Sequence, residues 1–117
     1  MNVKEFYERI GGNYDLAKSR MLSDERIKKY LMKFSSYLSL ERLKKAVEDK
    51  KYPDIFAITH DLKGMCLNLE LTPLAKSSSE LCEAVRHGEP SVDIVPLFKA
   101  VCSDYEKVVT AISEFIA

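Results

Sequence analysis

Apolar residues recur along most of the chain at intervals of three or four positions, which is the spacing of one face of a helix. Long alternation of apolar and polar residues, which is typical of strands, is nearly absent. The clearest apolar stripe lies near the end of the sequence and consists of Val95, Phe98, Val101, Cys102, Tyr105, Val108, Val109 and Ile112. The pattern predicts an all-α protein.

Glycines and capping residues divide the first part of this pattern into short helices. A helix over residues 3–10 is expected to end at Gly11-Gly12, because glycine readily adopts the left-handed conformation that closes a helix. Asn13 is placed to cap a second short helix, and Ser23 is placed to cap a third. We expect residues 1–36 to form short extra helices ahead of the main fold.

Longer helical segments follow within residues 39–116. Two of them open at Tyr52-Pro53 and Thr72-Pro73, since the missing N–H of proline does no harm in a first helical turn. We expect these two helices to run to about Glu70 and to His87-Gly88. Short loops make neighbouring helices antiparallel, so the sequence predicts an up-down-up-down antiparallel four-helix bundle.

Composition and charge narrow the class of protein. A chain of 117 residues, 46% of them hydrophobic, fits a single domain over residues 1–117 with a small core. Eighteen basic residues balance eighteen acidic ones, so the overall charge implies neither a nucleic-acid partner nor a membrane partner. The start lacks the apolar run of a signal peptide, and the three widely spaced cysteines suit reduced core residues. We expect a cytoplasmic, monomeric protein.

The segment 53–70 carries the most informative arrangement of residues. On a helical wheel of about 100° per residue, its apolar residues form one core stripe. The stripe consists of Ile55, Ile58, Leu62, Met65 and Leu69. His60 falls on the opposite side of the wheel, so the sequence predicts that its imidazole faces solvent.

Four residues surround His60 on this outer face: the apolar Phe56 and Leu67, the cation Lys63, and Gly64. Exposed apolar residues beside a reactive group favour a docking surface. Glycine inside a helix costs about 1 kcal/mol relative to alanine, so its presence calls for a reason. Position i+4 is where a side chain would crowd the imidazole, and we interpret Gly64 as giving steric access to the ring.

These residue types suit the carrying of a phosphoryl group. A neutral imidazole is a good nucleophile near neutral pH, because the ordinary pKa of the group is about 6.5. A phosphoryl group on His60 would bring about two negative charges, which the Lys63 ammonium would offset. The sequence has no glycine-rich nucleotide loop and no carboxylate cluster suited to Mg²⁺, so a partner is expected to bring the other catalytic parts.

The stretch His60-Asp61-Leu62-Lys63-Gly64 resembles the signature His-x-Leu-Lys-Gly of the histidine-containing phosphotransfer (HPt) domain. The segment from Leu74 to Glu89 also resembles the helix and turn that follow the signature, and the resemblance covers about residues 40–115. Met65 and Leu69 depart from the family pattern, since a small residue and a glycine are common at these positions. Both lie on the predicted inner face, so the departures concern helix packing more than the face that carries His60.

Carried over by matching position, the resemblance implies a histidine phosphotransfer protein. His60 would accept a phosphoryl group from a phospho-aspartyl receiver domain and pass it to another receiver in a multistep phosphorelay. Lys63 would neutralise the group, and Gly64 would give access to it. The implied partners are response-regulator receiver domains and a hybrid sensor histidine kinase. The chain would be a phosphocarrier, not an enzyme, with no cofactor of its own, and the receiver would supply Mg²⁺ during transfer.

Three residues are candidates for partner docking, namely Phe56, Leu67 and Thr59, the first two because of their places on the wheel. No metal site is expected, because no two cysteines stand at the close spacing of a zinc site. His87 is interpreted as a structural residue in a last helical turn.

Two alternatives to the phosphocarrier remain. One is a docking module of the same fold that is not phosphorylated and binds receiver domains or other partners. The other is a small helical adaptor unrelated to phosphate. The combination of His60, Lys63 and Gly64 favours the phosphocarrier, because neither alternative needs the costly glycine.

Overall fold

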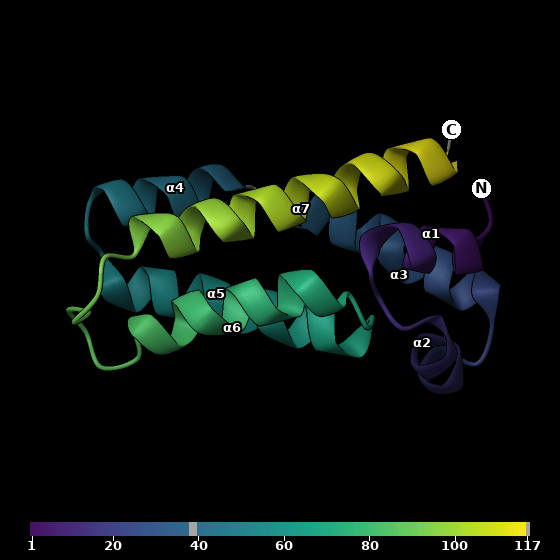
Figure 1. Ribbon diagram of the computed structural model, residues 1–117, viewed down its shortest axis with the longest axis horizontal. Helices are drawn as coiled ribbons and strands as arrows, with labels where there is room; N and C mark the ends of the chain where they lie inside the picture. The colour runs from purple at the N-terminus through teal and green to yellow at the C-terminus, as the bar shows by residue number, and fades with distance from the viewer. Residues whose placement is uncertain (38–39, 117) are drawn as a thin grey trace.

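The computed structural model describes residues 1–37 and 40–116, and these residues form seven helices and no strand. The helices are α1 (Val3–Ile10), α2 (Tyr14–Met21), α3 (Asp24–Tyr37), α4 (Leu40–Glu48), α5 (Tyr52–Asn68), α6 (Thr72–Ala84) and α7 (Val95–Ile116) (Figure 1). The all-α prediction is confirmed. The predicted division of the chain between residues 36 and 39 involves residues 38–39, which lie outside the described residues. Within the described part of the chain, no helix combines the length and the hydropathy that a membrane span requires.

Helices α4–α7 form an antiparallel bundle (Figure 1). α5 and α6 make a hairpin whose arms contact each other extensively, while α7 packs against α6 and α4 packs against α5. The chain reverses direction at each connection, which gives the predicted up-down-up-down order. α1, α2 and α3 gather at one end of the bundle, and α7 extends past α6 to contact α1 and α3.

Most helix starts carry the residue that the sequence indicated. Pro53 and Pro73 lie in the first turns of α5 and α6. The Asn13 side chain accepts a hydrogen bond from the backbone of α2, and the Ser23 hydroxyl accepts one of 3.2 Å from the backbone of α3. Gly11 closes α1 with φ of 72°, the left-handed conformation expected at a helix end.

The two helices of the hairpin end earlier than predicted. α5 ends at Asn68, two residues before the expected end at Glu70. α6 ends at Ala84, three residues before the expected last turn at His87-Gly88. After α6 the backbone bonds span three residues in place of four, as from the Gly88 amide to the Val85 carbonyl at 3.2 Å. The chain therefore leaves the α-helix through tight turns, which a helical wheel does not distinguish from a last helical turn.

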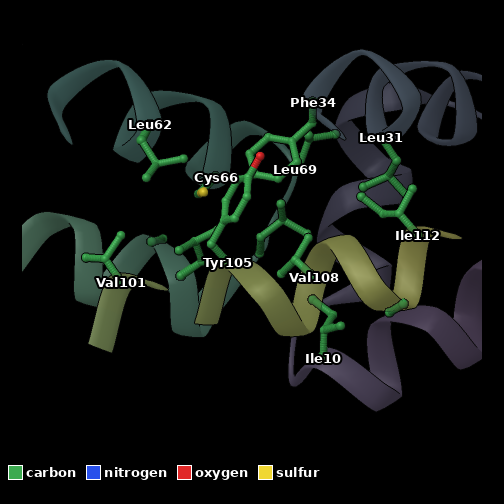
Figure 2. Close-up of a cluster of buried hydrophobic side chains, with 14 of the residues drawn as sticks. Ile10, Leu31, Phe34, Leu62, Cys66, Leu69, Val101, Tyr105, Val108 and Ile112 are labelled. Atoms are coloured by element: carbon green, nitrogen blue, oxygen red, sulfur yellow. The ribbon is translucent and has the colours of Figure 1, made fainter. Parts of the chain in front are cut away.

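The buried core joins the bundle to the N-terminal helices. Figure 2 shows apolar side chains of α7 meeting those of α1, α3 and α5. The labelled residues are Ile10, Leu31, Phe34, Leu62, Cys66, Leu69, Val101, Tyr105, Val108 and Ile112. Burial of one large apolar side chain contributes about 1.5–3 kcal/mol. Because α7 supplies buried residues from Val101 to Ile112, it stabilises both parts of the molecule.

The core predictions hold with exceptions at the edges of the core. The buried members of the predicted α5 stripe are Ile55, Ile58, Leu62 and Leu69. Met65 is half-buried instead, because it lines a surface pocket between α5 and the N-terminal helices. On α7, Val95 lies in the first turn and is 43% exposed, so it does not belong to the core.

The N-terminal helices contact the turn between α5 and α6. The Tyr7 hydroxyl donates a buried hydrogen bond of 2.7 Å to the carbonyl oxygen of Leu69. Arg20 forms an ion pair of 2.6 Å with Glu70, whose backbone has the unusual φ of 54°. Gly12 packs so closely on this turn that a Cβ there would lie 2.5 Å from the Glu70 carbonyl oxygen. These contacts fix the C-terminal end of α5.

Candidate functional site

His60 lies near the middle of α5 and is exposed, so the predicted outward orientation of the residue is confirmed. Lys63 follows one turn later and is half-buried, and Gly64 is exposed. Among residues 1–37 and 40–116, no side-chain hydrogen bond or ion pair engages either the imidazole or the Lys63 ammonium. Both groups are therefore available to an incoming ligand.

An aromatic ring contacts the imidazole from the preceding helical turn. The rings of Phe56 and His60 are stacked, with centroids 5.7 Å apart and an interplanar angle of 19°. The contact follows from the sequence, because residues i and i+4 of a helix lie one above the other. Phe56 is half-buried: it packs against the edge of the core and also borders the site around His60.

The end of α6 and the turn that follows it add charged residues to this face. The guanidinium carbon of Arg86 lies 5.7 Å from the centroid of the Phe56 ring, a cation–π arrangement. Arg86 Nε donates hydrogen bonds of 3.2 and 3.1 Å to the two carboxylate oxygens of Glu83. This hydrogen bonding lowers the pKa of the Glu83 carboxyl, and the nearby charges of Lys63 and His87 act in the same direction. This face thus brings the exposed His60 imidazole together with Lys63, Arg86 and Glu83.

No contact among the described residues requires glycine at position 64. A Cβ built at this position would meet no heavy atom within 4 Å, and the backbone does not adopt a positive φ there. Alanine would therefore fit in the isolated protein. Any need for the open space arises from a group that approaches His60 from outside.

The three docking candidates differ in their positions. Leu67 is 49% exposed, as the wheel predicts, and Phe56 is half-buried. The choice of Thr59 is wrong: its side chain is buried, with a relative exposure of 0%, and its hydroxyl donates a hydrogen bond of 2.7 Å to the Ile55 carbonyl. Adjacent helix positions are separated by about 100°, so Thr59 lies on a different side of α5 from His60, and its side chain is buried.

Sequence reasoning did not select Arg86 or Glu83 as site residues. Their spacing of three positions is that of a common ion pair, but it does not reveal which aromatic ring the pair lies beside. That information depends on how α6 packs against α5, where the Cys82 sulfur lies 4.0 Å from the Phe56 carbonyl oxygen. Within the described residues, no group of three or more potential metal ligands is brought together.

The arrangement can hold a phosphoryl group on an exposed ring nitrogen. The imidazole supplies a lone pair, Lys63 supplies a positive charge one turn away, and the neighbouring Gly64 leaves the approach open. A family model described as the Hpt domain matches residues 35–111, which is more than half of the chain and includes all of these residues. No curated protein and no solved structure matches the chain.

Proposed function

The chain belongs to the Hpt domain family, and from this premise we propose that it is a histidine phosphotransfer protein with His60 as the phosphoacceptor. In this proposal a phospho-aspartyl receiver domain donates the group, and a second receiver accepts it in a multistep phosphorelay. Members of the family are phosphocarriers and not enzymes in their own right. We also propose that the protein is cytoplasmic and that a hybrid sensor histidine kinase acts upstream of it.

The observation that carries the proposal is the exposure of His60 in the middle of a well-packed helix. The backbone of α5 is fixed by the core on its inner face, while the imidazole on its outer face has no hydrogen-bond partner among the described residues. A rigid helix with an accessible nucleophile suits transfer between proteins, because the partner finds the group in one place.

The proposed transfer is a displacement at phosphorus. An imidazole ring nitrogen forms a bond to phosphorus as the bond between phosphorus and the aspartate oxygen breaks, and that electron pair returns to the aspartate carboxylate. Lys63 offsets the negative charge on the phosphoryl oxygens during this step and in the product. The reverse displacement passes the group to another aspartate. The receiver would supply Mg²⁺ together with the carboxylates that hold it.

The experiment is transfer from a purified, phosphorylated receiver domain, followed by intact mass at neutral pH. We expect one added phosphoryl group that is lost in acid and survives alkali, as is typical of a phosphoramidate bond. His60→Gln should remove the label. The second histidine offers a matched control, because His87→Gln should leave labelling unchanged.

Two other outcomes would contradict the proposal. Binding of receivers without any added mass would favour the docking module that is not phosphorylated. Label that persists in His60→Gln and disappears in His87→Gln would show that His87, and not His60, is the phosphoacceptor.

A further inference from the structure

The stack of Phe56 on His60 is a contact within the chain, so it exists before any partner arrives. The centroids lie 5.7 Å apart at an interplanar angle of 19°, within the range of favourable offset stacking. His60 is exposed and has no side-chain hydrogen-bond partner among the described residues, so this ring contact is its main restraint there.

Phe56 in turn contacts residues at the end of α6 and in the turn that follows it. Its ring contacts the Arg86 guanidinium at 5.7 Å, and Arg86 is fixed by hydrogen bonds to both carboxylate oxygens of Glu83. The last turn of α6 also places the Cys82 sulfur 4.0 Å from the Phe56 carbonyl. A series of contacts therefore runs from Glu83 through Arg86 and Phe56 to the imidazole.

We propose that Phe56 is a positioning residue that fixes the orientation of the His60 imidazole, and that Arg86 supports it through the cation–π contact. The inference rests on the proposed phosphotransfer function for its consequence, but the geometry itself does not depend on it. It gives Phe56 a role different from direct contact with a partner.

The physical reason lies in the freedom of an exposed histidine. On a helix such a side chain has two accessible χ1 wells and a broad χ2, so a free imidazole points its ring nitrogens in several directions. Displacement at phosphorus requires one nitrogen in line with the bond that breaks. Stacking selects a ring plane, and loss of the stack is expected to slow transfer roughly three- to tenfold, the size of effect that aromatic pairs give.

The test separates positioning from docking. All variants are made in a His87→Gln background, so that every imidazole NMR signal belongs to His60. Phe56→Leu keeps an apolar side chain and removes the ring, Phe56→Tyr keeps the ring, and Leu67→Ala removes an exposed apolar group from the same face. For each variant we measure the imidazole C–H chemical shifts, the receiver concentration at half-maximal rate, and the transfer rate at saturating phosphorylated receiver.

We expect Phe56→Leu to move the imidazole C–H signals, because the ring current of the phenyl group is lost, and to lower the saturating rate with little change in half-saturation. Phe56→Tyr should restore both. Arg86→Gln should act in the same direction as Phe56→Leu, by a smaller factor. Leu67→Ala should leave the imidazole signals unchanged and raise the half-saturation concentration.

The inference is overturned if Phe56→Leu leaves the imidazole signals in place, or if it raises only the half-saturation concentration. The NMR result does not depend on phosphotransfer. If the parent protein takes no phosphoryl group while Phe56→Leu still moves the signals, the proposed function fails and the stacking geometry is upheld. If transfer occurs and the signals do not respond, the proposed function stands and the positioning role fails.

Discussion

The hydroxyl of Tyr7, in the first helix, donates a hydrogen bond of 2.7 Å to the backbone carbonyl oxygen of Leu69, 62 residues away. Both residues are buried. Leu69 follows α5 directly, so the bond connects the N-terminal helices to the end of the helix that carries His60. The extra helices thus contribute to the structure that supports the site.

Removal of this hydroxyl should destabilise the protein. Tyr7→Phe leaves the Leu69 carbonyl without this buried donor, and we expect the free energy of unfolding to fall by about 1–2 kcal/mol. Urea unfolding at neutral pH measures the change. Tyr52→Phe is the control, because no hydrogen bond of the Tyr52 hydroxyl occurs among the described residues. Equal losses in the two variants would contradict the prediction.

The same residue should make stability sensitive to alkali. Burial, followed by the charge of Glu70, raises the pKa of the Tyr7 phenol well above its usual value. The unfolded chain releases this proton near pH 10 while the folded protein retains it, so stability is full below about pH 10 and falls as the pH rises above that value. The fall should be shallower for Tyr7→Phe in urea titrations between pH 9 and 11. Parallel curves would show that Tyr7 does not contribute.

Two glycines should respond in opposite directions to alanine. At Gly64 an added Cβ meets nothing within 4 Å, so Gly64→Ala should stabilise the protein by about 0.5–1 kcal/mol through helix propensity. At Gly12 the Cβ would lie 2.5 Å from the Glu70 carbonyl oxygen, so Gly12→Ala should cost about 1–3 kcal/mol. Thermal and urea unfolding measure both changes. If Gly64→Ala also destabilised, an unrecognised contact inside the chain would have to explain this glycine.

Two adjacent serines of α6 provide another matched pair. Both Ser77 and Ser78 are buried, but only the Ser77 hydroxyl donates a hydrogen bond, to the Leu74 carbonyl at 3.3 Å. Among the described residues the Ser78 hydroxyl has no partner. A buried hydroxyl without a partner costs free energy, so Ser78→Ala should be neutral or stabilising by up to about 1 kcal/mol. Ser77→Ala should lose about 0.5–1 kcal/mol, and the reverse order in urea unfolding would contradict the prediction.

The sequence predicted features that depend on residues near one another along the chain. Proline placement predicted the starts of α5 and α6, and helical periodicity predicted that His60 faces outward. The prediction of Thr59 as a docking residue is wrong, because a position adjacent to His60 lies about 100° from it around the helix, and the Thr59 side chain is buried. The ends of α5 and α6 were harder to predict from the sequence, because an α-helical turn and a tight turn use the same residue types.

Contacts between distant segments could not be predicted in this way. The Phe56–Arg86 contact joins α5 to the turn after α6, and the bond from Tyr7 to Leu69 joins α1 to the turn between α5 and α6. Neither periodicity nor capping specifies which pairs meet across such separations. They are set by the packing of helices, which depends on the volumes of many side chains at once.

The last helix returns to the first. Phe115 contacts Phe6 with ring centroids 5.9 Å apart, and Glu114 forms an ion pair with Arg9. The first and last helices therefore lie side by side. The same packing of helices is compatible with other orders of the helices along the chain. A circular permutant joined through a short linker at this point, and opened in the loop between α6 and α7, should keep the His60 face intact.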